Sequence, residues 1–198
     1  PKLLVASANP GKVRELKKLL EGLVLQVIGP DELPGPVPAF DEQGSSFCEN
    51  AAAKARHWQQ CTGMAALADD SGLEVEALEG APGIRSARFA GDHATDSENV
   101  ALLLEKLDGL GQGERRARFF CCLALCRPGS TLVTFTGSCQ GRILNEPVGR
   151  NGFGYDPVFF YPPLKASFAQ LGAREKNRVS HRARALEKLR RHLLKHGL

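Results

Sequence analysis

Long apolar runs are missing from this chain of 198 residues, which has no stretch of about 18 uninterrupted apolar residues. Its first residues also lack a basic stretch followed by a long apolar block and a cleavage site. We therefore expect a chain that neither spans a membrane nor is secreted, with a cytoplasmic location. No sequence period of about 20 to 50 residues recurs, which excludes repeat architectures.

Closely paired cysteines are lacking as well. The six cysteines are Cys48, Cys61, Cys121, Cys122, Cys126 and Cys139. They have neither the CxxC spacing of a zinc site nor the density of a disulfide scaffold. Cys121 and Cys122 lie in an apolar run, where neighbouring strand residues point to opposite faces and serve packing better than ligation. We expect reduced thiols in the core.

Aromatic residues make up only 7% of the chain and are almost absent from its basic C-terminal segment. Residues 165–198 hold ten Lys or Arg against two Asp or Glu, which leaves 16 against 20 in the rest. A basic segment without aromatic rings for bases to stack on is a weak indication of nucleic-acid binding. We expect a solvated helix face with a few phosphate contacts, and no stable nucleic-acid partner.

The chain does contain alternating strand and helix patterns, and at 42% apolar residues it can bury one core, so we expect one domain over residues 1–198. Strand patterns cover residues 3–6, 23–28, 65–68, 117–126, 131–136 and 158–160. Helical patterns cover residues 13–20, 47–61, 95–107 and the segment from Ser180 onward, with one capped turn at 167–171. Residues 30–44 and 80–92 have loop composition. The strands at 117–126 and 131–136 form a hairpin pattern, so the predicted sheet is mixed, with helices around it.

The first candidate for chemistry is a strand-to-helix loop. It consists of Ser7, Ala8, Asn9, Pro10, Gly11 and Lys12. The unpaired N–H groups of a helix N-terminus, its dipole and a nearby lysine suit a phosphate. The segment is not a Walker A loop, and it is equally consistent with an ordinary helix start capped by Asn9.

The second candidate is the acidic pair Asp69 and Asp70, which directly follows the strand pattern at 65–68. The pair is therefore predicted at a strand's end, where open α/β sheets place ligands. Other acids within reach are Asp41, Glu42, Glu74 and Glu76. Mg²⁺ prefers such oxygen ligands, and a cation relieves the repulsion between adjacent carboxylates. The alternative is that Asp69 pairs with an arginine and Asp70 caps a turn.

The third candidate is the glycine-rich loop at residues 150–157, which contains Phe153, Gly154, Tyr155 and Asp156. Flexible backbone, two aromatic faces and a carboxylate are typical of a nucleobase clamp. A glycine-built turn with both rings in the core fits the same residues. A Rossmann fingerprint is excluded, because a β-rich run follows the glycines where that fingerprint requires a helix.

The fourth candidate is a set of cations near the C-terminal helix, namely Lys176, His181 and Arg182. Arg can donate to an oxygen and Lys to a phosphate. Taken alone, such residues are more typical of solvated surface groups. The same holds for Lys54, Arg56 and His57 on the helix at 47–61.

In this order, the segments resemble the non-canonical purine triphosphate pyrophosphatase family, also called inosine triphosphate pyrophosphatases or HAM1-like proteins. The resemblance covers nearly the whole chain. Its motifs are residues 7–12, 47–51, 68–73, 80–83, 152–157 and 180–182. One such motif is weak, whereas the full ordered set is specific.

The resemblance implies a long twisted mixed sheet flanked by helices, with two lobes around a central substrate cleft, in a homodimer. It implies hydrolysis of ITP, dITP and XTP to the monophosphate and pyrophosphate with Mg²⁺, or Mn²⁺ in its place. Asp70 is the implied proton acceptor and metal ligand, with Glu42 as a second metal-site carboxylate and Ser71 touching substrate. The loop at 7–12 and Lys176 are assigned chiefly to phosphates. Phe153, Gly154, Tyr155, Asp156, His181 and Arg182 are assigned to the base.

Two other functions stay open at this point. One is a related pyrophosphatase acting on pyrimidine or modified triphosphates. The other is a nucleotide- or RNA-binding module without catalysis, against which the acidic pair argues, because carboxylates repel phosphate unless a metal intervenes.

Overall fold

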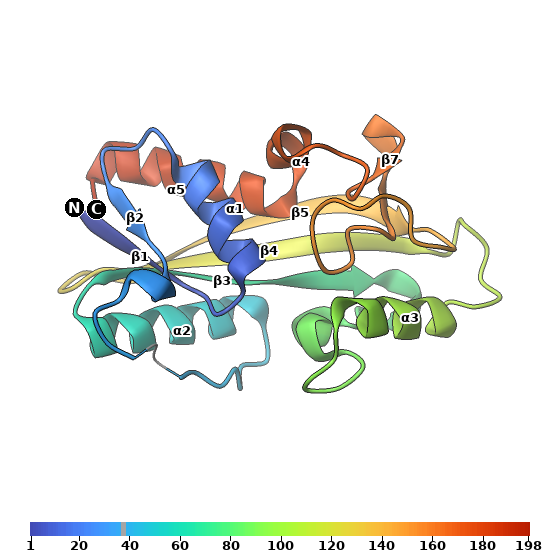
Figure 1. Cartoon of the computed structure of the whole chain (residues 1–198), viewed down its shortest axis with the longest axis horizontal. Coiled ribbons are helices and arrows are strands. Elements are labelled where there is room, and N and C mark those ends of the chain that lie inside the picture. Colours follow the sequence, from blue (N-terminus) through green and yellow to red (C-terminus); the bar gives the residue numbers. More distant parts are fainter. Residues whose placement is uncertain (37–38) are drawn as a thin grey trace. The chain divides into compact units, whose positions relative to one another are not determined.

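The computed structural model describes residues 1–36 and 39–198, so Val37 and Pro38 of the predicted loop at 30–44 lie outside the described residues. Seven strands form one sheet in the order β2-β1-β3-β4-β5-β6-β7 (Figure 1). They are β1 (Lys2–Ala6), β2 (Gln26–Ile28), β3 (Ala65–Val75), β4 (Arg116–Cys126), β5 (Val133–Ile143), β6 (Phe159–Tyr161) and β7 (Ala166–Ser167). β1 pairs in parallel with β2 and β3, whereas β6 pairs antiparallel with β5 and β7. The predicted mixed sheet is confirmed.

The helices are α1 (Pro10–Leu20), α2 (Phe47–Thr62), α3 (Asp96–Lys106), α4 (Ala173–Val179) and α5 (His181–His196). Asn9, Ser46 and Thr95 cap α1, α2 and α3 by accepting hydrogen bonds from first-turn N–H groups. Within the described residues, no helix combines the length and apolar character that a membrane span requires.

The contacts of the chain divide it into two compact units. The first unit comprises Pro1–Asp70, Cys121–Gly137 and Ala183–Leu198, and the second comprises Ser71–Phe120 and Ser138–Arg182. β3, β4 and β5 contribute residues to both. The single domain expected over residues 1–198 stays a prediction.

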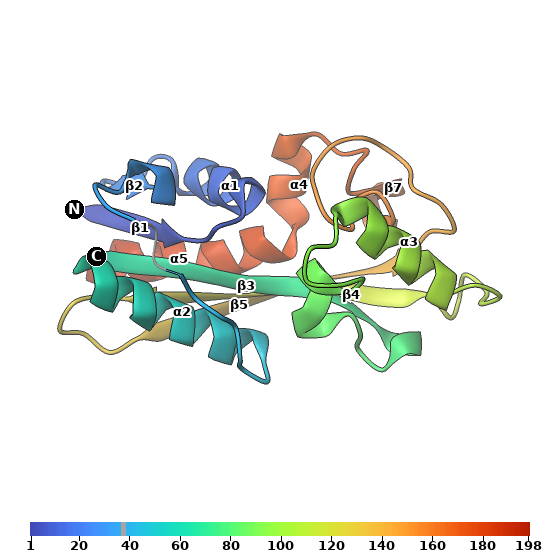
Figure 2. The ribbon, with the colours of Figure 1, turned by 60° about the horizontal axis from the view of Figure 1, so that its bottom comes forward.

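Side-chain alternation along the strands builds the core of the first unit. Residues on one face, such as Leu3, Val5, Leu67 and Leu123, are fully buried in a cluster with the apolar stripes of α1 and α5. Residues between them face the side of α2, where Ala51, Ala55 and Trp58 are buried. In Figure 1, α1 and α5 lie on one side of these strands and α2 on the other, and both termini lie at the same end of the unit in Figures 1 and 2. Each face of the sheet therefore has its own helix layer.

The second unit has a separate core, rich in aromatic residues. Phe119, Phe159 and Phe168 contact one another with ring centroids 4.5 to 5.8 Å apart. Leu103 and Leu107 of the α3 region pack in the same cluster, together with Leu73 and Val75 at the end of β3. The loop at residues 150–157 packs against this core.

The structure differs from the predicted elements in several places. The strand predicted at 131–136 runs on to Ile143 as β5, and the one predicted at 23–28 is shorter, from Gln26 to Ile28. β3 runs on to Val75, so the expectation that Asp69 and Asp70 follow the end of their strand is wrong. Ala6 at the end of β1 pairs with Ala68, so the two acids lie just past the end of β1 instead. α4 was not predicted, and residues 168–170 form a hydrogen-bonded turn after β7 rather than a helical turn.

Candidate active site

The loop at residues 7–12 is a well-capped helix start. The Asn9 Oδ1 accepts a hydrogen bond from Lys12 N at 3.1 Å, and the Ser7 hydroxyl accepts one from Asn9 N at 3.2 Å. Pro10 is the first residue of α1. A cavity of about 560 Å³ beside the loop is lined by Ser7, Ala8, Pro10, Val13, Arg14, Lys17, Pro30 and Asp31. The phosphate role of residues 7–12 stays a prediction, and the cap geometry is compatible with it.

Asp69 and Asp70 point to opposite faces of the sheet, because neighbouring side chains alternate along β3. Asp69 is fully buried on the face of α1, where its Oδ1 lies 2.7 Å from the Lys12 ammonium. Its expected partner in the alternative interpretation was an arginine, and the structure gives it Lys12. The predicted repulsion between the two carboxylates is therefore relieved because they lie on opposite faces of the sheet and because Asp69 is paired with Lys12.

Asp70 is 5% exposed and lies on the opposite face, where the side chain of Asn50 on α2 hydrogen-bonds to it. The pKa of Asp70 is raised to about 6, chiefly because burial disfavours the charged form. The charge of Glu42 adds to this rise, while Lys12, Lys54 and the Asn50 hydrogen bond oppose it. Within the described part of the chain, the buried Asp70 Oδ2 has no hydrogen-bond partner. Such an oxygen suits a proton or a cation, so Asp70 fits both roles assigned to it.

Lys54 and Asn50 complete what we call the carboxylate cluster, defined as Glu42, Asp69 and Asp70 with Lys12, Lys54 and Asn50. Lys54 forms an ion pair with Glu42, and its ammonium also donates to the Asp69 carbonyl oxygen at 3.3 Å. Asn50 accepts from Gly44 N at 2.7 Å, which fixes the loop that carries Glu42. Asn50 was missed from the sequence and Lys54 was treated as a surface residue, although their i, i+4 spacing places both on one face of α2.

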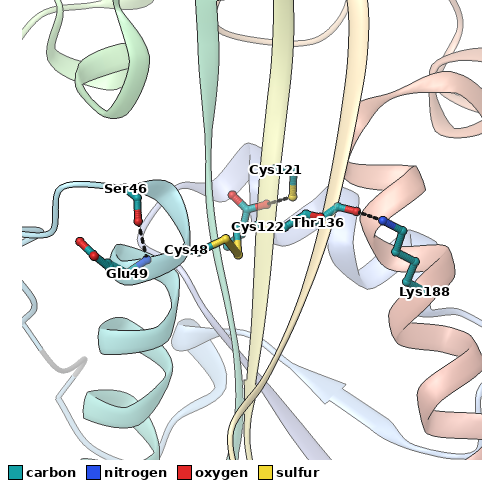
Figure 3. Close-up of a disulfide and its surroundings, with 8 residues drawn as sticks. Ser46, Cys48, Glu49, Cys121, Cys122, Thr136 and Lys188 are labelled. Carbon is teal, nitrogen blue, oxygen red and sulfur yellow. Dashed lines mark hydrogen bonds between the residues drawn. A yellow bond between two sulfur atoms is a disulfide. The ribbon is translucent and has the colours of Figure 1, made fainter. Parts of the chain in front are cut away.

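A disulfide between Cys48 and Cys122 joins the first turn of α2 to β4 (Figure 3). The Cα atoms are 5.3 Å apart and 74 residues separate the two cysteines in sequence. The prediction of reduced thiols is therefore wrong for Cys48 and Cys122. Adjacent residues on β4 point to opposite faces of the sheet, so Cys122 reaches Cys48 on α2 while Cys121 does not. Cys122 faces α2, whereas the Cys121 thiol donates to Asp69 Oδ2 at 3.3 Å on the other face.

The second unit holds an aromatic-cation cluster, defined as Phe153, Asp156, Lys176 and Arg182. The Lys176 ammonium lies 2.6 Å from Asp156 Oδ2 and 4.9 Å from the centre of the Phe153 ring. Asp156 also accepts from Phe153 N at 3.0 Å, and Arg182 lies over the same ring at 5.7 Å. Since Lys176, Asp156 and Arg182 are each at most 7% exposed, the ring is held between paired, largely dehydrated groups.

Glycine is required at position 152 for this arrangement. Gly152 has a φ of +79°, and a Cβ there would lie 2.0 Å from Asp156 Oδ2. Gly154 N donates to Asp96 Oδ2 at 2.7 Å, which ties the loop to the first turn of α3. The loop is therefore fixed by its own backbone and by α3.

The remaining predicted residues of this unit have structural partners. Arg182 donates to the Ser71 hydroxyl at 2.8 Å, and His181 stacks on Phe119 with ring centroids 4.7 Å apart. Tyr155 is 4% exposed, donates to the Ser86 carbonyl at 2.7 Å, and has its pKa raised by burial. Core packing thus accounts for Tyr155, and its assignment to the base stays a prediction.

The basic C-terminal segment makes many contacts within the protein. Lys188 donates to the Thr136 carbonyl at 2.6 Å, and Arg190 donates to the carbonyls of Leu19 and Glu21. These contacts favour a structural use of the charge over the nucleic-acid-binding alternative.

Among residues 1–36 and 39–198, no group of three or more His, Cys, Asp or Glu is arranged to hold a metal ion. The assignment of Asp70 and Glu42 to a metal site stays a prediction, and Glu42 is paired with Lys54 in this structure. Carboxylate oxygens are the donor type that Mg²⁺ prefers, and it is commonly bound by one or two of them together with substrate phosphates.

A mixed sheet covered by helices and a buried acidic pair beside Lys12 and Lys54 define an α/β protein with a charged candidate site. The chain belongs to the Ham1 family, whose model matches residues 3–192.

Several relatives and solved structures are similar over nearly the whole length. The dITP/XTP pyrophosphatase of Desulforamulus reducens is 49% identical, with 94% of this chain and 92% of that protein covered. That of Exiguobacterium sp. is 50% identical, with 95% and 94% covered. A HAM1 protein structure from Coxiella burnetii has a TM-score of 0.87 at 42% identity, with 98% of each chain covered.

Proposed function

We propose that this chain hydrolyses non-canonical purine nucleoside triphosphates, namely dITP, ITP and XTP, to the monophosphate and pyrophosphate. The observation that carries the proposal is Asp70 in a chain of the Ham1 family: it is a buried carboxylate under the influence of the charges of Lys12 and Lys54, and its Oδ2 has no hydrogen-bond partner among the described residues. The names of the relatives support the substrate class.

Asp70 is the proton acceptor in this reaction. A water oxygen bonds to the α-phosphorus, the bond from that phosphorus to the bridging oxygen breaks, and the water proton passes to Asp70. Without a metal, the pKa of Asp70 is about 6, so the carboxylate is ionised at neutral pH and available to a proton or a cation. Lys12 and Lys54 offset the charge of the phosphates.

Mg²⁺, or Mn²⁺ in its place, is the proposed cofactor, and Asp70 and Glu42 are the residues that hold it. When bound, the metal neutralises charge on the phosphates and orients them. The loop at residues 7–12 is assigned to the phosphates by resemblance. A homodimer and a cytoplasmic location are part of the same proposal.

Base recognition is assigned to the aromatic-cation cluster with His181. Arg182 is the proposed donor to O6 of hypoxanthine or xanthine, a position where adenine carries an amino group that accepts no such bond. Phe153 supplies a stacking face, and Ser71 contacts substrate. Lys176, which was assigned chiefly to phosphates, is paired with Asp156 beside Phe153, so its geometry groups it with the base contacts.

The test is product analysis over a panel of triphosphates. The protein is incubated with Mg²⁺ and equal dITP, ITP, XTP, ATP, GTP and dTTP, and monophosphate and pyrophosphate are quantified, with Asp70→Asn in parallel. We expect pyrophosphate from dITP, ITP and XTP, reduced at least about 100-fold in the variant. Preferential hydrolysis of dTTP would point to a pyrimidine enzyme, and no hydrolysis of any triphosphate would overturn the proposal.

A further inference from the structure

The Asp69 carboxylate is held from two sides. It is fully buried, its Oδ1 lies 2.7 Å from the Lys12 ammonium, and its Oδ2 accepts from the Cys121 thiol at 3.3 Å. A carboxylate removed from water is stable only when its oxygens have donors or cations nearby. The orientation of the Asp69 carboxylate therefore depends on Cys121 of β4 as well as on Lys12 of the loop at residues 7–12.

Cys121 combines two properties at its position on β4. Its side chain is fully buried in the apolar layer that also contains Leu67 and Leu123. A thiol packs there as a small hydrophobic group and still donates a hydrogen bond, which the methyl groups of Ala or Val cannot do. The cysteine thus fills the apolar layer and donates a hydrogen bond to the Asp69 carboxylate.

We propose that Cys121 is a positioning residue that orients Asp69 and, through Asp69, the Lys12 ammonium for phosphate binding. The Lys12 side chain is only 16% exposed, so it has little room to adjust when its partner turns. The inference rests on the proposed function, in which Lys12 binds phosphate. We expect its main effect on substrate affinity, because the Lys12 ammonium contacts Asp69, whereas Asp70 lies on the other face of β3 and is reached by Lys12 only through its charge.

The experiment compares Cys121→Ala, Cys121→Ser and Cys126→Ala, the last being the same substitution at another buried cysteine of β4. KM and kcat are measured for dITP, and the dissociation constant of inorganic tripolyphosphate with Mg²⁺ is measured by calorimetry. For Cys121→Ala we expect KM and that constant to rise about 3- to 10-fold with kcat within about 2-fold. Cys121→Ser keeps a donor and should restore both, while Cys126→Ala should leave both unchanged. Should Cys121→Ala unfold, Cys121→Val supplies the donor-free variant.

A double-mutant cycle separates positioning from packing. In a Lys12→Ala background the donor-free variant should cause no further loss of tripolyphosphate affinity, because the residue through which it acts is gone. The inference is overturned if the loss persists in that background, if Ser fails to restore affinity, or if Cys126→Ala causes the same loss. Wild-type protein that releases no pyrophosphate would overturn the proposed function instead, while the tripolyphosphate affinities still decide the role of Cys121.

Discussion

At the scale of residues, two neighbouring aspartates have different surroundings. Asp69 is paired with Lys12, whereas the Oδ2 of Asp70 is buried without a hydrogen-bond partner in the described structure. The sequence singled out the pair and residues 7–12 as candidates, but not the division of the two carboxylates between opposite faces of the sheet. That division follows from β3 continuing through both residues, which Asp-Asp-Ser-Gly does not suggest, since Asp and Gly are depleted in strands.

Asp70→Asn should make the metal-free protein more stable at neutral pH. Burial raises the pKa of Asp70 in the folded protein to about 6, so the folded state binds the Asp70 proton more tightly than the unfolded chain does. The stability that Asp70 contributes is therefore complete below about pH 4 and is lost as the pH rises through 6 and the buried carboxyl ionises. The isosteric amide avoids the buried charge, and we expect a gain of about 1 to 3 kcal/mol at pH 7.5 and almost none at pH 4. Urea unfolding in EDTA at both pH values measures this.

Asp108→Asn, at an exposed position, is the control for the Asp70 measurement and should change little at either pH. A destabilised Asp70→Asn protein at pH 7.5 would contradict the expected cost of ionising Asp70.

At the scale of elements, local chemistry predicted most of the helices. The caps at Asn9, Ser46 and Thr95 were visible in the sequence and are present. α4 was missed because its seven residues, mostly charged or polar, carry no apolar period. The contacts of α5 with α1 were also beyond prediction, since they join residues about 170 positions apart, a separation that no local pattern encodes.

Arg190→Ala should destabilise the protein without changing kcat. The Arg190 guanidinium donates to the carbonyls of Leu19 and Glu21 at 3.0 Å each, which satisfies the C-terminal end of α1. We expect a loss of about 1 to 2 kcal/mol in the free energy of unfolding, measured with urea.

Arg191→Ala is the matched control for Arg190→Ala, because Arg191 forms an exposed i, i+4 ion pair with Glu187. Its expected cost is about 0.5 kcal/mol or less. Equal losses in the two variants would show that the contacts of Arg190 with α1 contribute nothing particular.

At the scale of the whole molecule, local patterns predicted the mixed sheet, whereas two lobes were expected only from the family resemblance. Alternating patterns and one hairpin were enough for the fold class. The pairing of Cys48 with Cys122 depends on α2 packing against β4, and cysteine spacing alone carries no information about that contact.

Reduction of the disulfide should lower the stability of the protein. For a loop of 74 residues, loss of the cross-link costs about 4 kcal/mol when unfolded-chain entropy dominates. Urea midpoints with and without a phosphine reductant measure the effect. Cys48→Ser should match the reduced wild type and be insensitive to reductant, while Cys61→Ser, at an exposed cysteine outside the disulfide, should behave as wild type. A wild-type midpoint that reductant leaves unchanged would contradict this expectation.

The contacts of Asp156 have a consequence for protein engineering. One carboxylate oxygen serves both the Lys176 ammonium and the Phe153 amide, and it leaves no space for a side chain at Gly152. A saturation library that varies Gly152, Asp156 and Lys176 one at a time will therefore return mostly clones in which this loop has lost its shape. Altering the base recognition proposed for this loop calls for exchanging residues 152–156 and Lys176 together, as a single cassette.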